Sequence, residues 1–152
     1  MAVWQYSITL FPASGLVNFM GKRPKVLDES ISLEYNLWEG ADSRTEFWIK
    51  NFLSFMSIRK RDYGIIFMGS ESGNDVQLVE AGGHISEINT RIDLRDLNSG
   101  FLKRVLDIAQ KYELLVITED GRVLDPDINE VYSAICDSKQ YRFVQEPGSL
   151  FE

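Results

Sequence analysis

Three strand-length segments follow one another along the chain with only short turns between them. Residues 63–69 form an apolar run of strand length, residues 75–80 (DVQLVE) are a second strand candidate, and residues 84–96 alternate between apolar and polar positions. The first turn is built from Ser, Glu, Gly and Asn, and the second contains two glycines, as is typical of hairpins. Strands joined so closely pair antiparallel, because parallel neighbours need a long crossover. The sequence therefore predicts an antiparallel meander at the centre of the fold.

Segments with helical spacing of apolar residues flank this meander. Residues 43–57 open with a capping-box pattern, in which Ser43 is followed three residues later by Glu46. A second helix is predicted over residues 98–112 from its apolar face. A third is predicted to begin at residues 125–126, because proline suits the first helical position. The helices therefore precede and follow the meander.

Two further strands complete the predicted order. Residues 3–11 alternate and end at Pro12, residues 113–119 are mostly apolar, and residues 30–38 are open to a short edge strand. Helices on both sides of a meander pack together on one face of the sheet. We therefore expect one domain over residues 1–152 with an α+β fold, a two-layer sandwich of a mainly antiparallel sheet with helices on one face.

Charge and composition exclude several classes of function. The chain has 23 acidic and 16 basic residues and a net charge of −7, which disfavours nucleic acid as a partner and favours a basic protein. The basic run Arg59-Lys60-Arg61 is expected at the end of the predicted 43–57 helix, where cations offset the helix dipole. No apolar run has the roughly 18–20 residues that a membrane span needs. We therefore expect no membrane association.

Residue types for metal or covalent chemistry are scarce. The chain has one cysteine and one histidine, which rules out zinc sites built on these residues, and no catalytic motif is present. The N-terminus lacks the basic region of a signal peptide, so we expect a cytoplasmic protein. We predict no enzyme activity, no catalytic residue, no metal site and no cofactor.

The alternating strand at residues 84–96 is the first candidate binding surface. Its apolar positions point to one side, and five charged or amide side chains point to the other. One interpretation is a solvated sheet face with cross-strand charge pairs. The other is a docking surface, since arginine is enriched at interfaces. The candidate partner-binding residues are Glu87, Asn89, Arg91, Asp93 and Arg95.

An acidic segment with interleaved aromatic residues is the second candidate surface. Residues 28–46 hold six acidic residues and one basic residue. An aromatic anchor surrounded by acids suits a basic partner, because the ring supplies buried area and the charges steer association. The alternative is a solvated loop whose tryptophan closes the edge of the core. The candidate partner-binding residues are Glu34, Tyr35, Trp38, Glu39 and Asp42.

Several marks spread over the chain resemble those of small acidic cytoplasmic bacterial orphan proteins of the immunity type, which accompany polymorphic toxins. They are the opening W-x-Y-x-I-x-L with Pro12, the helix bearing Trp48, the strand RIDLR (91–95) and the closing FVQEP (143–147). The resemblance implies a single-domain, non-enzymatic protein that binds a toxin domain and neutralises it. It carries over no catalytic residue.

Two expectations of function follow. The first is an immunity-type inhibitor that binds a basic toxin domain through the acidic and charged surfaces. The alternative is a small-molecule or regulatory binding module that uses the open sheet face, with a pocket lined by Asn89, Arg91 and Arg95. An enzyme that uses the carboxylates of Glu87 and Asp93 is a third class without a supporting motif.

Overall fold

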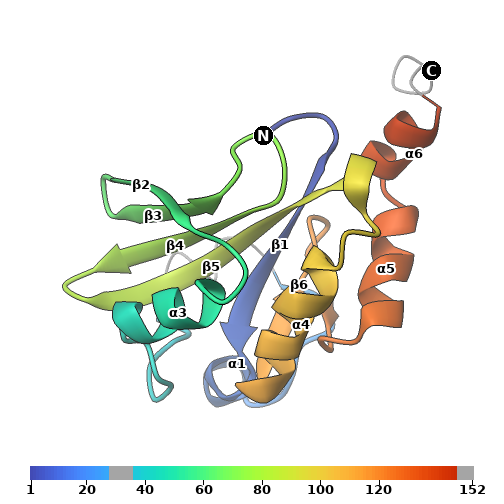
Figure 1. The fold of residues 1–152 in the computed structure, drawn as a ribbon. Coiled ribbons are helices and arrows are strands. Elements are labelled where there is room, and N and C mark those ends of the chain that lie inside the picture. The colour runs from blue at the N-terminus through green and yellow to red at the C-terminus, as the bar shows by residue number, and fades with distance from the viewer. Residues whose placement is uncertain (28–35, 147–152) are drawn as a thin grey trace.

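The computed structural model describes residues 1–27 and 36–146, and its centre is an antiparallel sheet (Figure 1). The strand order is β2-β3-β4-β5-β1-β6-β7, and every neighbouring pair is antiparallel. The predicted meander is β3–β4–β5. The strands are β1 (Gln5–Pro12), β2 (Ile58–Asp62), β3 (Ile65–Gly69), β4 (Asp75–Ala81), β5 (His84–Asp93), β6 (Leu114–Ile117) and β7 (Val123–Leu124).

Helices cover one face of this sheet, so the predicted α+β fold is confirmed. Figure 1 shows α3 and α4 across the face, with α5 and α6 beside α4. A 3₁₀ turn, η1, follows β5 directly. The described helical elements are α1 (Ala13–Met20), α3 (Thr45–Phe52), η1 (Leu94–Asp96), α4 (Phe101–Lys111), α5 (Ile128–Cys136) and α6 (Lys139–Gln145).

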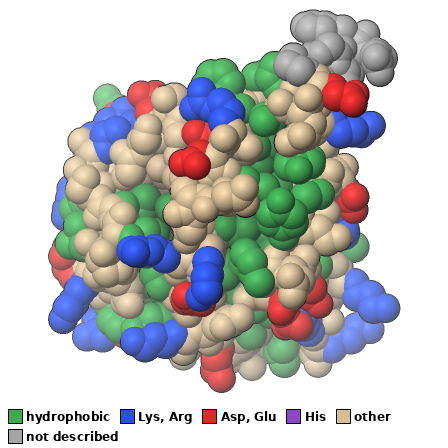
Figure 2. Space-filling view, turned by 45° about the vertical axis from the view of Figure 1, so that its right-hand side comes forward, with side chains coloured by type: hydrophobic (Ala, Val, Ile, Leu, Met, Phe, Trp, Pro, Cys, Tyr) green, Lys and Arg blue, Asp and Glu red, His purple; other side chains and the backbone are tan. Residues whose placement is uncertain are grey.

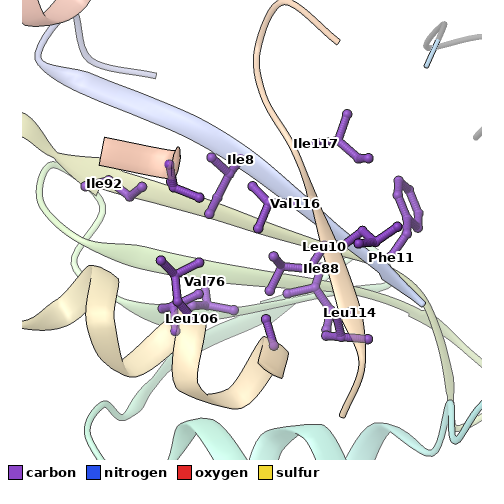
Figure 3. Close-up of a cluster of buried hydrophobic side chains, with 14 of the residues drawn as sticks. Ile8, Leu10, Phe11, Val76, Ile88, Ile92, Leu106, Leu114, Val116 and Ile117 are labelled. Atoms are coloured by element: carbon purple, nitrogen blue, oxygen red, sulfur yellow. The ribbon is translucent and has the colours of Figure 1, made fainter. Parts of the chain in front are cut away.

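Alternation along β5 fixes the register of the central strands. Ile88 lies opposite Leu10 of β1 on one side and Leu78 of β4 on the other, and all three are fully buried. A shift of one residue would turn this apolar set toward the other face, so burial specifies the register. Figure 3 shows this core, in which Leu106 of α4 joins side chains from β1, β4, β5 and β6.

The helix predicted over residues 43–57 is shorter than expected. It begins at Thr45, its N-cap is Arg44, and no side chain caps it. The predicted capping box is absent because the hydroxyl of Ser43 instead lies 3.0 Å from Nδ1 of His84, at the start of β5. The helix ends at Phe52, and the chain then enters edge strand β2. The basic run at residues 59–61 therefore lies on a strand, and its assignment to a helix end was wrong.

The sequence pattern gave no sign of α1. This helix follows β1 directly and ends at Met20, and its C-cap residue Gly21 adopts the left-handed conformation with φ 75°. A Cβ on Gly15 would lie 1.7 Å from the carbonyl oxygen of Leu37, so only glycine permits this close approach. The short edge strand considered for residues 30–38 falls mostly outside the described residues. Residues 36–38 form no strand.

Candidate functional site

The outer face of the sheet holds a buried ionic cluster around Asp75, which has no exposed surface. Arg91 of β5 donates from Nε to Oδ1 of Asp75 over 2.8 Å and from Nη2 to Oδ2. Arg59 of β2 donates to the same carboxylate over 3.3 Å. The hydrogen bonds to Asp75 raise the pKa of Arg91 above its usual range, although burial opposes this. The guanidinium of Arg91 is therefore paired with a carboxylate within the chain.

Asp93 and Arg95 also satisfy each other. Asp93 caps η1 by accepting from the backbone N–H of Arg95 over 3.0 Å, and the guanidinium Nε donates to the same oxygen over 3.0 Å. The Arg95 guanidinium stacks over the ring of Trp4, 4.2 Å from its centre, and donates to the carbonyl of Ser72. These contacts join the N-terminus, the β3–β4 turn and η1. Trp4 of the W-x-Y motif and the Asp93 and Arg95 residues of RIDLR therefore make contacts that stabilise the fold.

The remaining members of the predicted β5 surface are partly buried. Asn89 accepts a hydrogen bond from the hydroxyl of Thr9 on β1 over 2.9 Å. Glu87 is half-buried and lies opposite Val79 of β4. Arg95 lies beyond the strand, in η1, so the structure does not place it on the outer face in register with Asn89 and Arg91. Cross-strand ion pairing therefore accounts for Arg91, and a local pair with Arg95 accounts for Asp93.

The predicted acidic and aromatic surface does not form as expected. Trp38 is only 1% exposed, and its ring packs edge-on against Trp48 of α3 with ring centres 5.3 Å apart. The ring therefore closes the edge of the core, which is the alternative interpretation given for this segment. Asp42 pairs with Arg44, whose hydrogen bond lowers the pKa of the Asp42 carboxyl, while Glu39 is exposed. The other two members, Glu34 and Tyr35, lie outside the described residues.

Helix α5 exposes apolar side chains that the sequence interpretation did not single out. Ile128 and Tyr132, one helical turn apart, are 39% and 38% exposed, whereas Val131 and Ile135 face the core. The hydroxyl of Tyr141 on α6 adjoins the Cys136 thiol and Tyr132, and these neighbours raise the pKa of Tyr141, the thiol most of all. Figure 2 shows hydrophobic side chains gathered in a band on this side of the molecule.

The other flank of α5 is acidic. A rotation of about 100° per residue places Ile128 and Tyr132 on one flank of its exposed side, and Glu130 and Asp137 on the other. The stretch 113–137 contains seven acidic residues and one basic residue. Exposed aromatic and acidic side chains thus lie together on one helix. We call this surface the α5–α6 face; it comprises Ile128, Glu130, Tyr132, Asp137, Tyr141 and Val144.

A cleft of about 390 Å³ borders the acidic flank of the α5–α6 face. Tyr6 of β1 is almost fully buried beside it. Burial raises the pKa of Tyr6, and the carboxylates of Glu119 and Asp120 act in the same direction. The Tyr6 phenol is therefore neutral at physiological pH. The lining residues are Tyr6, Glu119, Asp120, Arg122, Ala134, Asp137, Ser138, Lys139 and Gln140.

Two of the cleft carboxylates are held by neighbouring groups. Asp120 accepts from the hydroxyl of Thr118 and, over 3.1 Å, from Nε of Arg122. The Thr118 hydrogen bond is the main cause that lowers the pKa of Asp120, and Arg122 adds to it. Glu119 accepts from the backbone N–H of Ser7 over 2.9 Å and from the amide of Gln140. The cleft thus has a polar wall in which Glu119 and Asp120 are held in place.

Other kinds of site have little support in residues 1–27 and 36–146. Within these ranges no group of three His, Cys, Asp or Glu residues is placed to hold a metal ion. No helix there is long and apolar enough to cross a membrane. Comparisons of the chain with protein-family models, curated proteins and solved structures give no match. The α5–α6 face is therefore the candidate site that the geometry supports best.

Proposed function

We propose that this chain is a non-enzymatic immunity-type protein that binds a basic bacterial toxin domain and neutralises it. The observation that carries this proposal is the α5–α6 face, where α5 exposes apolar side chains on one flank and acidic side chains on the opposite flank. The sequence predicted an aromatic residue among acids as a binding surface, but over residues 28–46 and not on α5. The exposed pair Ile128 and Tyr132 supplies the anchor.

The chemistry of the face favours a protein partner. Tyrosine is enriched among the residues that contribute most to interfaces, because its rigid ring buries much area with little loss of conformational freedom. Glu130 and Asp137 are exposed on the opposite flank of the same helix. Their charges would attract a basic partner and accelerate its association. The net charge of −7 acts in the same direction at long range.

The first test is a pull-down from the source organism at low and then at high salt, with mass spectrometry of the bound proteins. We expect a basic partner in a stoichiometric complex that weakens as salt is raised. The purified partner is then tested for toxicity with and without this chain. A complex without protection, or no complex at either salt concentration, would count against the immunity proposal.

Single substitutions then test the face. We expect Tyr132→Ser to weaken partner binding about 30-fold, the effect of losing an interface anchor worth about 2 kcal/mol. Asp137→Asn should lower the association rate constant and make it depend less on salt. The dissociation rate constant should change less. Val17→Ser is the matched control, because Val17 is a similarly exposed apolar residue on α1. Equal binding by Tyr132→Ser and Val17→Ser, measured by calorimetry, would place the interface elsewhere.

A further inference from the structure

The β2–β3 hairpin carries the basic run on an edge strand. β2 is the first strand in the sheet order, so only β3 pairs with it in the described part of the chain. Lys60 and Arg61 are exposed, and Arg59 points to the cluster around Asp75. An edge strand presents unpaired backbone N–H and C=O groups to any extended segment that fits beside it. A bulge interrupts β2 between Ile58 and Lys60, so the regular free edge that is open to strand addition is formed by residues 60–62.

Tyr63, at the tip of this hairpin, is unusual in two respects. Its side chain is 98% exposed, and its backbone adopts the left-handed conformation with φ 49°. Bulky residues are rare at positive φ, and a tight hairpin turn prefers Asn, Asp or Gly there. The ring gains almost no packing within the chain in return. Strained residues that their own fold does not explain are concentrated at binding sites.

The positive charge on β2 determines which kind of segment can pair with its free edge. Lys60 Nζ lies 4.8 Å from the ring centre of Phe67, and Arg61 reaches Glu46 only at 4.0 Å, so both cations keep exposed surface. Two copies of β2 paired edge to edge would bring these like charges together, which is destabilising. An acidic strand would instead place carboxylates against them. The edge is thus protected from self-pairing and suited to an acidic segment.

We propose that the β2–β3 hairpin binds an extended, acidic segment of a second protein, which adds to the sheet beside β2 and contacts Tyr63. In such additions the backbone hydrogen bonds supply affinity, and alternate side chains supply specificity. The hairpin lies at the β2 edge of the sheet, whereas the α5–α6 face adjoins the other edge (Figure 1). This proposal and the proposed function can therefore fail separately.

The test uses a fluorescent peptide of about eight residues, Glu except for two adjacent central Val residues, so that carboxylates lie on both faces of the strand, as Lys60 and Arg61 do. Fluorescence anisotropy measures binding to the full chain, and hydrogen exchange measures protection of the β2 amides. We expect Lys60→Glu with Arg61→Glu to weaken binding at least about tenfold, because both attractive charges become repulsive. Tyr63→Asn, which suits the turn, should weaken it less. Lys103→Glu with Lys111→Glu on α4 makes the same change of charge away from the hairpin and should weaken binding far less.

Three results would overturn the proposal. One is absence of binding up to about 1 mM peptide, the limit of weak recognition. Another is equal binding of a version with a central proline, which cannot complete a strand. The third is a dimer in sedimentation that dissociates when Lys60 and Arg61 are reversed, since the occupant would then be a second copy of the chain.

Discussion

The ionic cluster around Asp75 and the α5–α6 face contain similar residue types but use them differently. Asp75 has no exposed surface and is held by Arg91 and Arg59. On the α5–α6 face, Glu130, Asp137 and Tyr132 are exposed. Charges that pair within the sheet stabilise the fold and have little capacity left for a partner. Exposed charges beside exposed rings can contribute to recognition.

The comparison predicts its largest effect at Asp75. Asp75→Asn should lower the free energy of unfolding by about 3 kcal/mol, because the guanidinium of Arg91 stays buried without its counter-charge. Urea denaturation measures the loss. Asp137→Asn on α5 is the matched control, and we expect a change within about 0.5 kcal/mol there. A loss below about 1 kcal/mol for Asp75→Asn would mean that the cluster contributes little to stability.

A double-mutant cycle sharpens the same comparison. Asp75→Leu and Arg91→Met should each destabilise the protein, and the double variant should lose less than the sum, with a coupling of about 2 kcal/mol. The control cycle uses Lys103 and Asp107, an exposed pair one turn apart on α4 with 2.9 Å between Nζ and Oδ2. Its coupling should be about 0.5 kcal/mol or less. Similar coupling in the two cycles would contradict the difference between buried and exposed pairs.

The sequence predicted the centre of the fold well because burial there imposes a simple pattern. Ile88 and Ile92 alternate with polar residues, and this period alone specifies a strand with one buried face. Short turns then required antiparallel neighbours. The ends of elements were less predictable, because they depend on contacts from distant segments. Ser43, for example, meets His84 instead of capping a helix.

The candidate sites were harder to predict for a related reason. Arg91 was identified as a binding residue because the carboxylate opposite it, Asp75, could not be seen before the register of β4 and β5 was known. Trp38 is buried although it was a candidate binding residue, and Tyr132 is exposed although it was not singled out, since only packing decides which ring is buried. One signal was present, however. The helical spacing that places Val131 and Ile135 inward leaves Tyr132 on an exposed flank.

The smallest predicted effect on stability lies at Asp120. This residue combines features of the two regions, because it is exposed but also paired. Its side chain is 60% exposed, like the acids of the α5–α6 face, but it is paired with Thr118 and Arg122. These partners lower the pKa of Asp120 in the folded state. Its contribution to stability is therefore present above the pKa of about 3.9 that an unfolded aspartate has. It is lost as the pH falls below that value.

Solvent screening limits this contribution to about 0.5 kcal/mol. Asp120→Asn should therefore lower the free energy of unfolding slightly at pH 7. The variant should also lack the small fall in stability that protonation of Asp120 causes at acidic pH. Titration of the Asp120 carboxyl by NMR should give a midpoint below that of an ordinary aspartate, and Arg122→Gln should raise it. A midpoint at or above the ordinary value would show that the carboxylate is free of these partners. Asp120 would then belong with the exposed acids of the α5–α6 face, and the anionic surface offered to a partner would extend across the cleft.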